Sequence, residues 1–447
     1  MPQNGTQSDS KSYRRRQFLK ATGAASAVGL TGLAGCTQND SGSGGDGGDG
    51  GDGGGDGDTE TTTESGGGGE NVIKLGGSMS LSGDNADLGQ LYKDAYELTI
   101  DKINEMGGVE RDGTSYELEL VLRDDETDAS KSKSIYQELI DQEGIDYLVG
   151  PYSSTVTLPA SAVAAQNQKP MVEGGGASPE IFSQGNKWIF GLLPTADKYP
   201  LSAIDMAAAQ DPAAETAALL AEDDTFSQST AEGARQKFDD AGIELVVDET
   251  FPSETSDLST NLGKVRDNDA DMLILAAHQK HAIVMAKQLE TQNVNVDMAM
   301  ATVGSLNQSF KDETGKNGDY VYGPSSWANN ADFDDYVYGS TTDFVSAIQD
   351  EYGYEPDYHN AAGAGVIQTY HKALQQAPEL TPTAVRDTIR DIQFTGAYGN
   401  IAFGSNGVID KKMLVYQWQP DSGKQIVWPE SVQQSAPIYP TPSWDER

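Results

Sequence analysis

The chain of 447 residues contains little cysteine, little histidine and little positive charge. Its single cysteine, Cys36, excludes a disulfide within the chain and any metal site built from several cysteines. There are 30 Lys and Arg residues against 69 Asp and Glu residues, a formal net charge of −39. Because so acidic a chain repels nucleic acid, we expect no nucleic-acid partner. Molar salt shortens the Debye length to about 3 Å and screens this self-repulsion, so the composition favours a protein of an extreme halophile over an ordinary acidic secreted protein.

Motifs of common enzymes and nucleotide-binding proteins are also missing. The sequence has no Walker loop, no G-x-S-x-G elbow and no H-E-x-x-H. His278 and His281 are three residues apart, but they span a predicted strand end and helix start, without Cys or Glu at ligand spacing. We therefore expect no enzyme activity, no metal and no cofactor. A secreted hydrolase is the least favoured class, since no nucleophile with a base is visible.

The first 36 residues predict export and lipidation. Residues 15–20, RRQFLK, resemble a twin-arginine export signal. The weakly apolar stretch 21–33 that follows is too short to span a bilayer. It ends in Leu33-Ala34-Gly35-Cys36, which resembles a lipobox. We predict a twin-arginine signal peptide with a lipobox over 1–36 and lipidation of Cys36, which anchors the protein at the outer face of the cell membrane.

Residues 37–70 have a composition that does not form a core. They are mostly Gly, Asp, Thr and Ser, with no apolar residue and a repeated negative charge. The Gly-Gly-Asp repeats resemble calcium-binding nonapeptides, but the large apolar positions of those repeats are absent. We predict a disordered tether over 37–70, with the folded part beginning near Asn71.

Strand and helix patterns alternate from residue 71 onward, in two series. Predicted strands lie at 71–80, 115–124, 145–150 and 169–174, and then at 216–223, 243–249, 271–278 and 296–304. Amphipathic patterns between them predict helices, as in residues 87–106. This alternation is typical of α/β proteins with parallel sheets covered on both faces. We predict two doubly wound lobes, with a ligand at the carboxyl ends of the strands.

Two motifs at predicted strand ends carry small hydroxyl residues and glycines. "GPYSSTVTLPAS" (150–161) places Ser153, Ser154 and Thr155 at a helix start, and "KPMVEGGGASPEIF" (169–182) places three glycines before another. Free N–H groups at a helix start favour a carboxylate or another polar oxygen, although Ser and Thr also cap helices without binding anything. The glycine loop lacks the Gly-Lys-Ser/Thr ending and the G-x-G-x-x-G spacing of nucleotide loops. Two such motifs on neighbouring strands favour a binding site.

Residues 72 to about 429 resemble the type I periplasmic-binding proteins of ABC importers, in the branch that binds branched-chain amino acids. The order and spacing of the matching motifs make this resemblance specific. They are LSG (81–83), INEMGGV (103–109), VLRDDETD (121–128), VGPYSSTVTLPAS (149–161), GGGASPEIF (174–182), AEDDTFSQS (221–229) and TGAYGNIAFGSNG (395–407).

The resemblance implies two lobes joined by a hinge of three crossing strands, with the ligand clamped between the lobes. The crossings are expected near Thr195, Pro324 and Gly399. Lobe one would then comprise 71–195 and 325–399, and lobe two 196–324 and 400–447.

The resemblance also assigns residues to the site. Ser154 and the loop at Gly176 and Ala177 would hold the polar end of the ligand, while Phe226 and His278 of lobe two cover its side chain. Trp327, just past the second crossing, is expected to stack on a ligand near the hinge. The remaining predicted ligand-binding residues adjoin these positions or replace residues that relatives use; they are Tyr152, Ser153, Thr155, Gly175, Ser178, Asp224 and Thr302. We expect Trp or Asp at Gly176 to abolish binding with the fold intact.

Two departures leave the ligand open. Relatives use a threonine hydroxyl in the glycine loop, where this chain has Ala177 with Ser178 adjacent. Relatives also pair the α-ammonium group with an acid from lobe two, where the stretch MATVGS (300–305) offers only Thr302. A buried ammonium group without a partner costs several kcal/mol. Either Asp224 substitutes for that acid, or the ligand is not an α-amino acid.

These observations predict a monomeric, lipid-anchored receptor. It would bind an amino acid or a similar small polar solute and deliver it to ABC permease subunits in the membrane. The alternative is a sensor of the same fold that signals to a membrane partner without transport.

Overall fold

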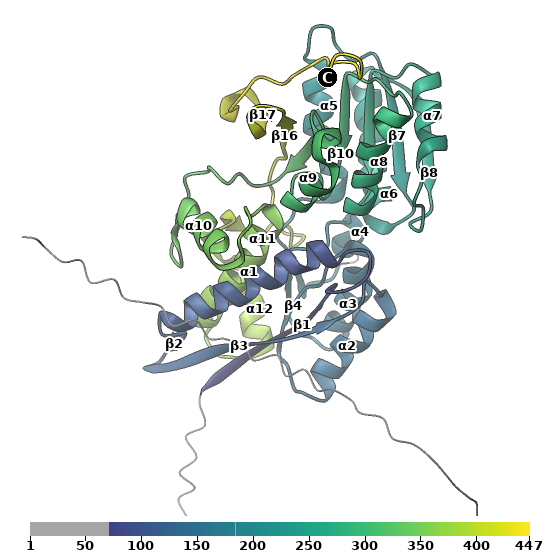
Figure 1. The fold of residues 1–447 in the computed structure, drawn as a ribbon. Helices are drawn as coiled ribbons and strands as arrows, with labels where there is room; N and C mark the ends of the chain where they lie inside the picture. The colour runs from purple at the N-terminus through teal and green to yellow at the C-terminus, as the bar shows by residue number, and fades with distance from the viewer. Residues whose placement is uncertain (1–70, 184) are drawn as a thin grey trace, which may run out of the picture. The chain divides into compact units, whose positions relative to one another are not determined.

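A computed structural model describes residues 71–447 of the chain, except Gln184 (Figure 1). The predicted signal peptide, Cys36 and the predicted tether lie outside the described residues. Among the described helices, none combines the length and the apolar character that crossing a membrane requires.

Lobe one is built on a six-stranded sheet with the order β2-β3-β1-β4-β5-β6. Its strands are parallel except for β2, which pairs with β3 in the antiparallel direction. The elements are β1 (Val72–Met79), α1 (Ala86–Glu105), β2 (Val109–Arg111), β3 (Thr114–Asp124), α2 (Ala129–Asp141), β4 (Tyr147–Val149), α3 (Ser154–Gln166), β5 (Met171–Glu173), α4 (Pro179–Ser183) and β6 (Ile189–Gly191).

Lobe two is built on a seven-stranded sheet with the order β17-β16-β11-β10-β9-β7-β8. The strands from β7 to β11 are parallel, and β16 and β17 add an antiparallel edge. Its elements up to the second connection are a 3-10 helix (Ala196–Lys198), α5 (Leu201–Ala208), β7 (Thr216–Glu222), α6 (Thr225–Ala241), β8 (Glu244–Phe251), α7 (Ser259–Asp267), β9 (Met272–Ala276), α8 (Gln279–Thr291), β10 (Met298–Ala301), α9 (Gln308–Thr314), a second 3-10 helix (Gly315–Gly318) and β11 (Tyr322–Ser325).

After β11 the chain returns to lobe one, where α11 packs along α1 (Figure 1). It then re-enters the sheet of lobe two at β16. The elements of this part are β12 (Asp334–Asp335), β13 (Gly339–Ser340), α10 (Thr341–Tyr352), α11 (Tyr358–Gln376), α12 (Pro382–Asp391), β14 (Gln393–Gly396), β15 (Gly399–Ala402), β16 (Leu414–Gln419), β17 (Gly423–Trp428) and a third 3-10 helix (Glu430–Val432).

Alternating side chains of the central strands explain why both sheets are covered on both faces. In lobe two, Leu219 and Ile274 pack with residues of α5 and α6, whereas Leu220 and Leu273 pack with residues of α7, α8 and α9. Lobe one repeats this arrangement, with α1, α10, α11 and α12 in one core cluster and α2, α3 and α4 in the other. The predicted α/β class, with parallel sheets covered on both faces, is therefore confirmed.

The third connection lies later in the chain than Gly399. Gly399 has a φ of +85° at the turn of the β14–β15 hairpin, which sends the chain back toward lobe one. The N–H group of Gly191 in β6 donates to the carbonyl oxygen of Gly407 at 2.8 Å, and its own carbonyl oxygen accepts from Ile409 at 3.1 Å. The chain therefore remains beside β6 until Ile409 and enters the sheet of lobe two only at Leu414.

Candidate ligand-binding site

A cavity of about 210 Å³ lies between the lobes, close to the carboxyl ends of the strands, and we call it the interlobe cavity. Each lobe contributes polar side chains to its wall. Its lining residues are Asp84, Asn85, Thr127, Ser153, Thr155 and Val156 from lobe one, and Glu222, Asp224, Ser253, His278, Lys280 and His281 from lobe two. Four of the predicted ligand-binding residues therefore meet here: Ser153, Thr155, Asp224 and His278.

The N-terminus of α3 forms the lobe-one wall. Ser153 is the N-cap residue, and its carbonyl oxygen accepts hydrogen bonds from the N–H groups of Val156 and Thr157. The first N–H groups of a helix have no partner inside the helix. Those of Ser154 and Thr155 make no hydrogen bond to another described residue. This wall therefore offers hydrogen-bond donors and a positive end of a helix dipole to an anionic group.

Two carboxylates form the facing wall in lobe two. Asp224 caps α6, accepting hydrogen bonds from the N–H groups of Phe226 at 2.8 Å and Ser227 at 3.1 Å. Glu222 ends strand β7, and its Oε2 accepts from the N–H group of His278 and lies 3.0 Å from Nδ1 of His281. Within the described part of the chain, Oε1 of Glu222 takes no hydrogen bond and is available to a ligand.

The histidines keep both carboxylates ionised. Burial disfavours the charged form of each carboxylate, but the neighbouring imidazoles outweigh it and lower the pKa of Asp224 and of Glu222. His278 responds in the opposite sense: burial opposes its protonation, but Asp224 and Glu222 outweigh burial and raise its pKa. The wall therefore holds two ionised carboxylates beside a histidine whose protonated form they stabilise.

His278 also joins the two lobes. Its Nδ1 lies 2.8 Å from the hydroxyl oxygen of Tyr152 in lobe one. Its Nε2 is buried 3.6 Å from Oδ1 of Asp224 and has no hydrogen-bond partner among the described residues. A buried polar atom without a partner is unusual, and this one adjoins the interlobe cavity.

An aromatic cluster closes the inner side of the site. The ring of Tyr152 lies 5.8 Å from the ring of Tyr92 and 5.7 Å from that of His278. Phe226 is buried between Tyr199, at a ring distance of 5.1 Å, and His278, at 5.3 Å. Tyr152 and Phe226 thus contact His278, which lines the cavity, but neither of them lines the cavity itself.

The glycine loop has a different role from the one predicted. Oε2 of Glu173 accepts hydrogen bonds from the N–H groups of Gly175 at 2.8 Å and Gly176 at 2.5 Å. The hydroxyl oxygen of Ser154 accepts from the next two amides, those of Ala177 and Ser178, both at 3.0 Å. The expectation that these amides are free for a ligand is not met, because protein oxygens already occupy them.

Close packing, rather than ligand approach, requires glycine in this loop. A Cβ atom at Gly176 would lie 2.7 Å from the side chain of Thr157, and one at Gly175 would lie 2.5 Å from the carbonyl oxygen of Pro151. We therefore correct the expectation that Gly176→Trp or Gly176→Asp leaves the fold intact. Burial also raises the pKa of Glu173 to about 8, so this carboxyl is largely protonated at neutral pH.

Thr302 and Trp327 lie away from the interlobe cavity. The hydroxyl of Thr302 is buried in lobe two, where it accepts from the N–H group of Ala277 at 3.1 Å. Trp327 donates its indole N–H group to the carbonyl oxygen of Ala397 at 2.9 Å and lines a separate cavity near the connections. Neither residue lines the interlobe cavity.

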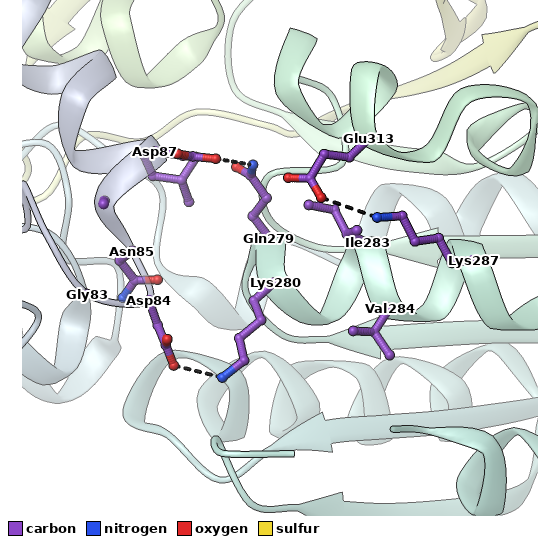
Figure 2. A pocket seen from close by; sticks show the side chains of 12 residues that line it. Gly83, Asp84, Asn85, Asp87, Gln279, Lys280, Ile283, Val284, Lys287 and Glu313 are labelled. Atoms are coloured by element: carbon purple, nitrogen blue, oxygen red, sulfur yellow. Dashed lines mark hydrogen bonds and ion pairs between the residues drawn. The ribbon is translucent and has the colours of Figure 1, made fainter. Parts of the chain in front are cut away.

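Two polar contacts join lobe one to α8 beside the site, one from Asp84 just before α1 and one from Asp87 in α1. A groove of about 460 Å³ lies between the start of α1 and α8. In this groove, Nζ of Lys280 lies 2.8 Å from Oδ2 of Asp84 (Figure 2). The amide nitrogen of Gln279 donates to Asp87 at 3.2 Å in the same groove (Figure 2). The described arrangement is thus one in which the lobes touch around the cavity.

Sequence reasoning did not identify Glu222, the second carboxylate of this wall. Glu222 is the last residue of the apolar strand TAALLAE. A charged residue at the end of such an apolar run could have indicated a residue of the site. Asp84, Asn85 and Lys280 were also missed, because their approach depends on how two distant segments meet.

His278 and His281 both contact protein groups. Nε2 of His281 lies 2.9 Å from the carbonyl oxygen of Thr255, and its Nδ1 lies beside Glu222. Within 71–447, Gln184 aside, no three His, Cys, Asp or Glu side chains are grouped to hold a metal ion.

A sequence model of the family described as "Periplasmic binding protein" matches residues 72–425. The Leu/Ile/Val-binding protein homolog 8 of Brucella abortus (strain 2308) is 26% identical over 380 residues, which cover 80% of this chain and 91% of that protein. The Leu/Ile/Val-binding protein homolog 7 of Brucella melitensis is 22% identical over 382 residues, covering 80% and 92%.

Solved structures share the fold. One is the branched-chain amino acid transporter substrate-binding protein LivJ of Streptococcus pneumoniae, in complex with isoleucine. Its TM-score is 0.70 at 19% identity, and the match covers 80% of this chain and 100% of that one. A solute-binding protein of an ABC transporter from R. palustris, in complex with benzoate, has a TM-score of 0.71 at 15% identity, covering 83% and 98%. At these identities the likeness establishes the fold alone.

Proposed function

The chain belongs to the periplasmic binding protein family, and from this premise we propose that it is the solute-binding receptor of an ABC importer. It binds an amino acid or a similar small zwitterion in the interlobe cavity and delivers it to permease subunits. The receptor acts as a monomer at the outer face of the cell membrane, where a lipid on Cys36 retains it after twin-arginine export.

One observation supports the proposed ligand chemistry: a wall that favours an anionic group faces a wall that favours a cationic group across a single cavity. The N-terminus of α3 at Ser153 and Thr155 favours a carboxylate, and Glu222 with Asp224 favours an ammonium group. A zwitterion fits both walls at once, so it has contacts with each lobe and stabilises the arrangement in which they touch. Glu222 thereby supplies the lobe-two acid that the sequence did not reveal.

The relatives support the same solute class. Leu/Ile/Val-binding homologues and an isoleucine-bound transporter protein share the family or the fold. The aromatic carboxylate in the R. palustris structure indicates that this fold also accepts ligands without an ammonium group. Glu222 and Asp224 favour the zwitterion, because both carboxylates attract an ammonium group, whereas they repel the carboxylate of an aromatic acid.

A thermal-shift screen tests this proposal. Amino acids, amides and carboxylic acids are added to the purified protein in molar salt, where binding to the folded state raises the melting temperature. We expect zwitterionic amino acids to give the largest shifts. The ligand found is then titrated against Glu222→Gln, which should weaken binding at least tenfold because it removes the charge facing the ammonium group.

The exposed Glu110 in β2 provides a matched control, since Glu110→Gln makes the same change of charge far from the cavity. Equal affinities of Glu222→Gln and Glu110→Gln would reject the assigned site. Uptake of the labelled ligand by cells, with and without the gene, separates import from sensing. Undiminished uptake in the deletion strain would argue for the sensor.

A further inference from the structure

A second cavity of about 470 Å³ lies beside the connections between the lobes, and we call it the hinge pocket. It is lined by the segment that follows β11, by residues just before and at the start of β16, and by residues of β17 and its following turn. It shares no lining residue with the interlobe cavity. Its volume lies in the range typical of small-molecule sites.

The wall of the hinge pocket is mainly apolar. Trp327, Phe333, Leu414, Ile426 and Val432 line it. Val432 is 48% exposed, and among the described residues Met106 is the only other large apolar side chain that is similarly exposed, at 52%. Together these side chains line a concave apolar surface that suits the apolar body of a small ligand.

Two neighbouring lysines add positive charge to this apolar wall. Neither Lys411 nor Lys412 has a carboxylate of another described residue within ion-pair distance, although the chain carries 69 acidic residues. The Nζ atom of Lys411 lies 3.6 Å from the ring centroid of Tyr398 and donates a hydrogen bond to the carbonyl oxygen of the same residue. Other donor positions of this amine remain for an anion.

The surroundings of Lys411 lack the partner that its charge requires. Burial lowers the pKa of Lys411 to about 7, because no nearby carboxylate compensates for the lost hydration. An anion that enters the pocket restores the charged form. Binding is therefore coupled to proton uptake by Lys411, and an anionic ligand should bind more weakly as the pH rises above about 7.

We propose that the hinge pocket binds a small amphipathic monocarboxylate, with its carboxylate on Lys411 and Lys412 and its apolar body against Trp327 and Phe333. Charge complementarity identifies the anionic end, and the apolar wall excludes a polar or doubly charged body. Phe333 also packs on Gly399 of lobe one, whereas Leu414 belongs to lobe two. A ligand in this pocket touches segments that connect the lobes, so its affinity depends on the hinge angle.

Titration calorimetry with 4-phenylbutyrate tests the proposal, and 4-phenylbutanol serves as the uncharged probe of the same shape. We expect the acid to bind the full chain and the alcohol to bind at least tenfold more weakly. The affinity for the acid should fall between pH 6.5 and 8.5, and the affinity for the alcohol should stay constant. Absence of binding of the acid at millimolar concentration would overturn the proposal.

Variants locate the binding site of the acid. Lys411→Met should weaken binding at least tenfold, whereas Lys133→Met, an equal change of charge on the exposed face of α2, should leave it unchanged. Ala331→Trp, which fills the pocket, should abolish binding, and Lys412→Met provides a further test if Lys411→Met does not fold. Glu222→Gln should have no effect. Loss of binding in Glu222→Gln, or unchanged binding in Lys411→Met and Ala331→Trp, would place the acid elsewhere and refute the inference.

Discussion

At the scale of single residues, Glu173 decides how the glycine loop is used. Glu173 is the last residue of β5, and its buried carboxyl group accepts hydrogen bonds from the N–H groups of Gly175 and Gly176. Those two bonds favour the ionised form, but burial outweighs them and raises the pKa to about 8. The loop thus holds an internal acid in the position where a ligand oxygen was expected.

This raised pKa predicts that Glu173 makes the folded state less stable as the pH rises. The unfolded chain releases the proton near the usual value of 4.5, whereas the folded chain keeps it until about 8. Between these values the folded state binds more protons, so its free energy of unfolding falls by up to about 1.4 kcal/mol per pH unit. Above the folded pKa the loss is complete.

Glu173→Gln should remove this pH dependence, because the amide keeps an oxygen for the two glycine N–H groups and does not titrate. Urea unfolding at constant salt measures the difference in stability between the variant and the wild type. We expect this difference to grow in favour of the variant from pH 5 to pH 8. Parallel curves for the two proteins would contradict the buried, titrating carboxyl, and Glu110→Gln controls for the loss of one charge at an exposed site.

At the scale of elements, α1 and α8 meet across the gap between the lobes. The ion pair of Lys280 with Asp84 joins different lobes, whereas that of Lys287 with Glu313 at 3.2 Å lies within lobe two (Figure 2). Both pairs are partly exposed, so each contributes about 1 kcal/mol or less. Only the first pair depends on whether the lobes touch.

Reversing the charge of Lys280 should therefore disfavour the arrangement in which the lobes touch. Lys280→Glu places a carboxylate beside Asp84, and we expect ligand affinity at low salt to fall by about two- to tenfold. Molar salt should reduce this effect, because the Debye length shrinks to about 3 Å. Calorimetry with the cavity ligand, together with the radius of gyration from X-ray scattering, measures both consequences.

Lys287→Glu is the control, since it breaks an ion pair of the same helix without affecting the contact between lobes. Adding Asp84→Lys to Lys280→Glu should restore most of the lost affinity. Equal losses for Lys280→Glu and Lys287→Glu would mean that the contact between α1 and α8 does not favour closure.

At the scale of the whole molecule, the net charge of −39 governs how stability depends on salt. Self-repulsion opposes the compact state more than the expanded one, and salt screens it. We expect the melting temperature to rise by several degrees between tenth-molar and molar KCl. Differential scanning calorimetry checks this, with sucrose as the control for effects that do not depend on charge. A melting temperature independent of KCl would contradict the inferred adaptation to high salt.

Local patterns alone determined much of the fold. The alternation of strands and helices over 72–304 follows from periodicities of two and of 3.6 residues, which depend only on near neighbours in the sequence. The same patterns located the motif at Ser153, because polar residues that follow a buried strand lie at one edge of a parallel sheet. Asp224 was predicted from the family resemblance instead. The motif resemblance predicted the two-lobed family fold.

The tertiary structure decided which groups remain free to bind a ligand. Ser154 and Glu173 accept hydrogen bonds from the amides of the glycine loop. Glu222 lines the interlobe cavity, whereas Trp327 lines the hinge pocket. Because the chain forms a hairpin at Gly399, the third connection lies closer to Leu414 than predicted. Each of these outcomes depends on contacts between segments far apart in the chain, and no local periodicity or motif spacing specifies such contacts.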